Sequence, residues 1–310
     1  MEVRVGIPRA LLYHYYQPAW EVFFKALGSK VIISPETNKK ILDQGVRVAV
    51  DDICLPFKVY FGHIIELRDK VDYLFVPRFI SLGKNNYVCP KFMGLPDMLT
   101  ATFNELPEMI KPVVDLRPGL RSIRKIAHQV GQKLGVGYFR IERAFRQAVQ
   151  QHLEFSTEQQ KAFAGGSDGS LRVAILGHAY LTYDKLTSMD IAGHLSKMGV
   201  NVITLEMIAP ALLEKAATRQ SKKLFWIYNR QVMGAAYHLL FEQEGQIDGI
   251  IQLTAFGCGP DSMIKELINI RGKKMGVAIL DINIDEHSGQ AGLITRLEAF
   301  IDLLERKVLA

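Results

Sequence analysis

The sequence predicts an α/β protein with two doubly wound parallel-sheet domains joined by a helical segment, and three observations lead to this fold class. Short runs rich in β-branched residues alternate with longer stretches of helical periodicity, which is typical of strand–helix–strand units. The chain has 310 residues, enough for two domains. A Gly- and Ser-rich stretch at 165–170 interrupts the alternation, which then restarts.

In the first half of the chain, most of the expected strands are followed by an expected helix. The first helix contains Pro18, where we expect a kink because proline lacks the backbone donor. The expected strands are 3–7, 30–34, 46–50, 72–76 and 112–115, and the expected helices are 10–27, 55–70 and 93–103.

Residues 120–164 have helical periodicity and little β character, which predicts one or two long helices. After the Gly- and Ser-rich stretch, the expected strands are 172–176, 201–205, 223–227, 248–254 and 276–282, with a final helix at 289–307. We therefore expect Rossmann- or flavodoxin-like domains at 1–118 and 169–310, joined by a helical connector and linker at 119–168.

Composition narrows the class of protein. With 48% hydrophobic and 23% charged residues, the chain is typical of a soluble globular protein. It has neither a signal-peptide pattern nor an apolar run long enough to span a bilayer. The formal net charge of +6 is dispersed and not interleaved with aromatic residues, so we expect no nucleic acid or membrane partner. Three cysteines without a secretory signal indicate the cytoplasm and favour metal or redox chemistry over disulfides.

The three cysteines are Cys54, Cys89 and Cys258, and each is followed by a proline one or two residues later. Because proline fixes φ and removes a donor, each thiol is expected on a rigid loop. We expect all three after the carboxyl ends of strands, the edge at which open parallel sheets bind ligands. Cys54 and Cys258 also lie at expected helix N-termini, where the dipole favours the thiolate and lowers the thiol pKa.

The placement of the thiols predicts one metal centre between the domains, with Gly257 and Gly259 allowing backbone N–H groups to approach Cys258. Three thiolates would hold a [4Fe–4S] cluster and leave one iron open. Zinc is an alternative, with His63 or His287 as the fourth ligand, although close Cys-x₂₋₄-Cys pairs are absent from the sequence. Three buried structural thiols are the third interpretation, and spacing alone leaves all three open.

Five other residues are candidates for the site. Lys58 and Lys91 would place cations near a cluster and stabilise its reduced form, or would simply be solvated. His63 could hydrogen-bond a cluster or substrate, or be structural. Glu286 and His287 follow the last expected strand, where they could act as acid and base, bind an open iron, or help cap the next helix.

Several motifs occur in one order along nearly the whole chain. They are Cys54-Leu55-Pro56-Phe57-Lys58 with Gly62-His63, Cys89-Pro90-Lys91, Gly177-His178-Ala179-Tyr180 with Tyr183-Asp184, Phe256-Gly257-Cys258-Gly259-Pro260-Asp261-Ser262, Asp285-Glu286-His287 and Thr295-Arg296-Leu297-Glu298-Ala299-Phe300. This set resembles the superfamily of 2-hydroxyacyl-CoA dehydratase subunits, acyl-CoA dehydratase activase-related proteins and double-cubane cluster proteins.

The resemblance implies that Cys54, Cys89 and Cys258 hold one cubane, and that a separate actin-like ATPase activator with its own iron–sulfur cluster supplies a low-potential electron. It is compatible with a homodimer or a heterodimer. The chain is shorter than the dehydratase subunits and lacks a Walker A motif, so we expect no ATP hydrolysis by this chain. With three cysteines, a double-cubane cluster would have to be shared between protomers.

Two classes of function follow from these motifs. One is a redox enzyme or enzyme subunit that performs reduction or dehydration in the manner of the 2-hydroxyacyl-CoA dehydratases. The other is a non-catalytic cluster carrier or electron relay. A zinc-containing or metal-free protein that binds a small ligand is the alternative to both.

Overall fold

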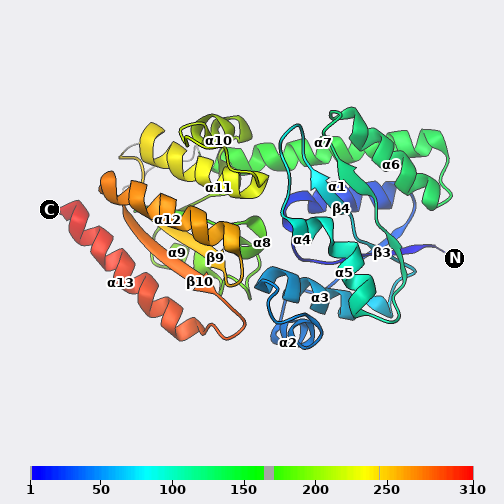
Figure 1. Cartoon of the computed structure of the whole chain (residues 1–310), viewed down its shortest axis with the longest axis horizontal. Helices are drawn as coiled ribbons and strands as arrows, with labels where there is room; N and C mark the ends of the chain where they lie inside the picture. The colour runs from blue at the N-terminus through cyan, green and yellow to red at the C-terminus, as the bar shows by residue number, and fades with distance from the viewer. Residues whose placement is uncertain (1, 164–170, 244, 310) are drawn as a thin grey trace. The chain divides into compact units, whose positions relative to one another are not determined.

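The computed structural model describes residues 2–163, 171–243 and 245–309 as a two-domain α/β protein with parallel sheets flanked by helices (Figure 1). The expected linker at 165–170 lies outside these described residues. The chain forms two compact units. The first contains 1–53, 57–157 and 225–227, and the second contains 54–56, 158–224 and 228–310.

The first unit has two parallel sheets, ordered β2-β1-β3-β5 and β4-β6. Its strands are β1 (Arg4–Ile7), β2 (Lys30–Ile33), β3 (Tyr73–Phe75), β4 (Arg78–Ser81), β5 (Glu108–Ile110) and β6 (Val113–Asp115). Its helices are α1 (Tyr13–Ala26), α2 (Lys39–Val48), most of α3 (Leu55–Arg68), α4 (Pro90–Met93), α5 (Leu95–Thr102), α6 (Arg121–Lys133) and most of α7 (Tyr138–Phe163).

The two sheets of the first unit are consecutive parts of the same pair of chain segments. Pro77 separates β3 from β4, and Pro112 separates β5 from β6. Pairing continues across the break, because the Val76 amide donates to Ile110 and the Arg78 amide to Pro112. Each proline thus interrupts the strand in its own segment, while the two segments stay paired.

One apolar cluster of the first unit is shared by its four-stranded sheet, α1, α6 and α7. Val5 and Ile7 of β1 are fully buried there. The ring of Phe24 from α1 meets that of Phe75 from β3 edge-on, with centroids 5.0 Å apart. Helix α1 continues through Pro18, so the expected helix forms without ending at the proline.

Helices α2 and α3 cross at two glycines. A Cβ added to Gly45 would overlap the carbonyl oxygen of Lys58, and one added to Gly62 would overlap that of Ile41. The backbones therefore approach as closely as glycine alone permits.

The second unit has one parallel sheet, ordered β10-β9-β7-β8. Its strands are β7 (Arg172–Leu176), β8 (Asn201–Thr204), β9 (Gly249–Ala255) and β10 (Ala278–Ile284). Its helical segments are α8 (Ala179–Thr182), α9 (Ile191–Lys197), the 3₁₀ turn Leu205–Met207, α10 (Pro210–Ala217), α11 (Ile227–Tyr237), the π-helical turn His238–Glu242, α12 (Gly259–Lys274) and α13 (Gln290–Leu309).

Helices cover both faces of this sheet. Residues of α10, α11 and α12 share one buried apolar cluster with Ala174 of β7 and Ile250 of β9. On β9, a Cβ at Gly249 would contact Phe300 and Leu304 of α13. All seven residues of β9 are buried, as expected for a central strand of a parallel sheet.

Two expected strands are wrong. Residues 46–48 end helix α2, where Ile41, Leu42 and Gly45 form the buried face while Val48 and Val50 are exposed. The alternating valines of 46–50 resemble a strand pattern. The buried residues, however, recur at helical spacing, and the segment continues the helix.

The other wrong strand is 223–227. It pairs at one bridge, between Trp226 and Tyr87, and α11 then begins at Ile227. The expected helix at 93–103 is divided at Gly94 into α4 and α5. Strands β4 (Arg78–Ser81) and β5 (Glu108–Ile110) were not expected.

Candidate functional site

The carboxyl edge of the second sheet carries the principal candidate site. From β7 the chain passes to β8 on one side, and the later strands β9 and β10 lie on the other side. The strand order therefore reverses between β7 and β9, and the loops after these two strands lead in opposite directions. Doubly wound sheets bind ligands in the crevice beside such a reversal, which is called a topological switch point. His178 follows β7, and Cys258 follows β9 and directly precedes α12.

Asp261 connects these two loops. Its Oδ1 lies 2.9 Å from His178 Nε2 and accepts a hydrogen bond of 2.5 Å from Asn229 Nδ2. All three residues are buried. His178 is stacked on Tyr180 and meets Tyr228 edge-on, so packing fixes the orientation of its ring as well.

The thiol of Cys258 is also hydrogen-bonded to Asp261. Burial raises the pKa of this thiol, and the negative charge of Asp261 raises it further. The expectation that the helix dipole lowers the Cys258 pKa is therefore wrong, because desolvation and a like charge outweigh it. Burial also acts to raise the pKa of Asp261, but the charge of His178 and hydrogen bonds from His178, Cys258 and Asn229 leave it below its usual range.

Cys54 lies against the loop that carries Cys258. It directly precedes the first residue of α3, is buried, and belongs to the second unit. Gly257 has φ of +79°, and a Cβ there would lie 3.3 Å from the Cα of Cys54. Gly257 thus lets the two cysteine-bearing segments approach, as expected, whereas a Cβ on Gly259 would meet nothing within 4 Å. The expected strand before Cys54 is helix α2.

A carboxyl and a phenol lie at the end of β8. Tyr183 Oη is 2.8 Å from Thr204 Oγ1 and donates to Glu206 Oε2 at 3.0 Å. Burial raises the pKa of Glu206 against the opposing effect of its hydrogen bonds and of His178. Within the described residues, Glu206 Oε1 and His178 Nδ1 are buried and form no hydrogen bond.

Cys89 belongs to the first unit, as do Lys58, His63 and Lys91. It is half-buried, follows β4, and directly precedes the short helix α4, which contains Lys91. The neighbouring Tyr87 ring is stacked on Phe225 with an interplanar angle of 4°.

Two other candidates of the first unit are buried in α3. Lys58 is 6% exposed, so it is not the solvated lysine of the alternative interpretation. The Nε2 atom of His63, a fully buried side chain, lies 3.0 Å from Thr37 Oγ1.

The candidates after β10 lie in a tight turn. The amide of His287 donates to Asp285 Oδ1 at 2.9 Å, and that oxygen also accepts from Ser288 Oγ. The Ser288 hydrogen bond holds the pKa of Asp285 below its usual range. His287 is exposed and Glu286 half-buried.

The sequence did not single out the polar residues around Cys258 as site residues. His178, Tyr183 and Asp261 belong to the ordered motif set, whereas Asn229 and Glu206 carried no motif. The available signal was position, since His178 and Glu206 are each the second residue after the end of a strand. Among the described residues, no three or more His, Cys, Asp or Glu side chains are grouped so that they could hold a metal ion.

No helix in the described part of the chain has both the length and the apolar character needed to cross a membrane. A comparison with solved structures finds the SBP FpvC from Pseudomonas aeruginosa in complex with Mn²⁺, at 12% identity, 98% coverage of each chain and a TM-score of 0.31. It also finds ZnuA, at 8% identity, 98% coverage of this chain, 99% of that chain and a TM-score of 0.31. At these values neither likeness bears on function.

No curated protein matches the chain. A family model does match: the CoA enzyme activase uncharacterised domain (DUF2229), over residues 4–208. The match includes Cys54, Cys89, His178 and Glu206, and it ends before Cys258. Because it covers about two thirds of the chain, the protein belongs to the family of CoA enzyme activase uncharacterised domains.

Proposed function

We propose that this protein is an iron–sulfur component of a CoA dehydratase system, holding one [4Fe–4S] cluster on Cys54, Cys89 and Cys258. The observation that carries the proposal is the approach of the Cys54 segment to the loop of Cys258, made through Gly257. Thiolates are the usual ligands of iron–sulfur clusters. The family match supports a role with CoA enzymes.

The residues present fit such a group in their donor chemistry. The backbone of Cys54 lies beside the loop that carries Cys258 in the second unit, and the third cysteine of the chain, Cys89, is half-buried on a loop of the first. When bound, the cluster would accept and donate single electrons at low potential. As proposed, a separate actin-like ATPase activator delivers the electron.

The residues around Cys258 would determine how its thiol loses a proton when the proposed cluster binds. The thiol is protonated in the metal-free protein because burial and Asp261 raise its pKa. Ligation requires loss of that proton from Sγ. The carboxylate of Asp261 already accepts the hydrogen bond from this thiol, and His178 and Asn229 hold its Oδ1 in place.

Anaerobic purification followed by iron and sulfide analysis tests the proposal. About four irons and four sulfides per chain are expected. Cys54→Ala, Cys89→Ala and Cys258→Ala should each lose most of this iron. Met263→Ala changes a sulfur side chain of α12 that is 73% exposed, and it should keep the iron.

A colourless protein with one zinc per chain would overturn the proposal. So would a full iron complement in any of the three cysteine variants. If the cluster forms but no ATPase activator reduces it, the carrier function replaces the enzyme function.

A further inference from the structure

The positive charge of the protein, which we expected to be dispersed along the chain, is in fact concentrated in one segment. Residues 117–146, here called the basic hairpin, consist of α6, the start of α7 and the loops beside them. They contain eight arginines and lysines and one acidic residue, a net charge of +7. The whole chain carries +6, so the other 280 residues together carry −1. Figure 1 shows α6 beside the start of α7, both within the first unit.

Most of this charge is not neutralised within the hairpin. Its one carboxylate, Glu142, is shared by Arg124 and His128. Five exposed cations of the hairpin form no ion pair in the part of the chain that the structure describes: Arg121, Lys125, Arg140, Arg143 and Arg146. Of these, Arg140 donates a hydrogen bond to the carbonyl of Ala26.

The spacing of these charges adds to the repulsion. Arg121 and Lys125 are four residues apart, and Arg143 and Arg146 are three apart. Like charges at these spacings destabilise a helix. The pattern is therefore better explained by a partner than by the stability of the hairpin.

Apolar groups are exposed within the same segment. Phe139 is 87% exposed and Tyr138 is 56% exposed, both at the start of α7. A hollow of about 300 Å³ runs along α7 from Phe139 past Arg143 and Arg146. Aromatic residues and arginine are enriched at protein interfaces, and tyrosine and arginine are enriched among the residues that contribute most binding energy there.

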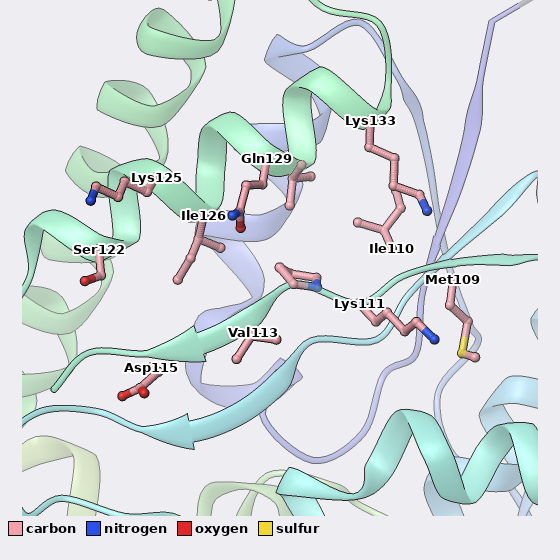
Figure 2. A pocket seen from close by; sticks show the side chains of 12 residues that line it. Met109, Ile110, Lys111, Val113, Asp115, Ser122, Lys125, Ile126, Gln129 and Lys133 are labelled. Carbon is pink, nitrogen blue, oxygen red and sulfur yellow. The ribbon is translucent and has the colours of Figure 1, made fainter. Parts of the chain in front are cut away.

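A second hollow lies on the other helix of the hairpin. It measures about 420 Å³ and is bounded by α6 and by residues 109–115. Figure 2 shows Lys125 and Lys133 extending from α6 and Lys111 from the facing strand segment, with Ile126 and Val113 between them. Lys133 is paired with Glu108. This arrangement suits side chains with an aliphatic stem and a carboxylate end.

We propose that the basic hairpin is a docking surface for an acidic protein partner. Charge complementarity selects a negatively charged partner. The two hollows accept protruding side chains, which a protein surface provides and a lipid bilayer surface lacks. The exposed aromatic pair is not arranged as the stacking ladder used for single-stranded nucleic acid. The inference does not depend on the proposed cluster.

The test uses a fluorescein-labelled random copolymer of glutamate and tyrosine as the acidic probe, with binding followed by fluorescence anisotropy. The variant R121E/K125E/R143E/R146E should weaken binding by about tenfold or more. The matched control K215E/K222E/K273E/K274E reverses four exposed lysines outside the hairpin, so both variants change the net charge from +6 to −2. The control should bind nearly as the wild type does.

Phe139→Ser tests the apolar part. It should weaken binding of the glutamate–tyrosine copolymer more than binding of polyglutamate, because only the former has aromatic side chains to bury. Circular dichroism and the iron content of each variant separate a loss of docking from a loss of fold or of the cluster.

Two results would overturn the proposal. One is equal weakening by the hairpin variant and the control, which would show that total charge alone governs binding. The other is tighter, hairpin-dependent binding of an oligothymidylate or of phosphatidylserine vesicles than of the copolymer. That result would assign the surface to nucleic acid or to lipid.

Discussion

The two glycines that flank Cys258 make different contacts, and this difference can be tested by one substitution at each. Gly257 has positive φ and faces Cys54, so Gly257→Ala should cost about 1–2 kcal/mol in the free energy of unfolding because an L-residue is strained there. It should also lower the iron content, since the added methyl group lies 3.3 Å from the Cys54 Cα. Urea unfolding and iron analysis measure the two effects.

Gly259→Ala is the control. The added methyl group would meet nothing within 4 Å, and position 259 begins helix α12. Stability and iron content should therefore remain close to wild type. Equal effects of the two substitutions would mean that the approach to Cys54 has no role in holding the thiols.

At the scale of single residues, the sequence predicts where a residue lies in the fold better than it predicts which residues that residue contacts. Cys258 was correctly expected after a buried strand and before a helix. The contact between His178 and Asp261 was not expected, because 83 residues separate them. It depends on β7 pairing with β9, and no local pattern specifies that pairing. The depth of burial that raises the Cys258 pKa has the same non-local origin.

At the scale of elements, the crossing of α2 and α3 is sensitive to a single methyl group. Gly45→Ala or Gly62→Ala would place a Cβ onto the backbone of the other helix, and backbone atoms cannot move aside as a side chain can. We expect each to lower the free energy of unfolding by about 3 kcal/mol, the upper end for overpacking. Urea unfolding of the metal-free protein is the measurement.

The matched control is Gly292→Ala in α13, where an added Cβ meets nothing within 4 Å. It should raise stability by roughly 0.5–1 kcal/mol, because alanine loses less conformational entropy than glycine in a helix. A Gly45→Ala protein as stable as Gly292→Ala would contradict the close crossing.

The elements themselves were largely predictable, and the errors are of two kinds. Eight of the ten expected strands correspond to strands of the structure. The two wrong ones, 46–50 and 223–227, are short runs in which apolar residues suggest a strand. The first ends a helix, and the second forms only one bridge. In the second run, Phe225 is stacked on Tyr87 and Trp226 forms a single bridge. Strands β4 and β5 were missed because each is the second or first half of a strand pair interrupted by a proline, Pro77 or Pro112, and only the other half of each segment was expected.

At the scale of the whole molecule, the uneven charge should make stability depend on salt. Arg143 lies three residues from both Arg140 and Arg146. Arg143→Glu replaces two repulsions with two attractions, which should raise the free energy of unfolding by about 1 kcal/mol at low ionic strength. The gain should shrink as salt screens the charges. Urea unfolding at several NaCl concentrations measures this.

Lys273→Glu makes the same change of charge elsewhere. Lys273 lies in the last turn of α12, where a cation favours the helix dipole, so its reversal should lower stability by about 0.3–1 kcal/mol. Opposite signs for the two variants would show that the placement of charge matters. A stabilisation by both would mean that lowering the net charge is sufficient.

The prolines beside the three cysteines have a consequence for how the protein matures. Pro56, Pro90 and Pro260 each stand within the first two residues of a helix that begins just after a cysteine. Because the proline ring fixes φ near its helical value, these three helix starts form without a bound ligand. If the proposed cluster binds here, its ligand loops would already be folded before it arrives, unlike those of a zinc finger, which folds around its ion. Assembly factors would meet a native protein, and repair of an oxidised centre would proceed without refolding.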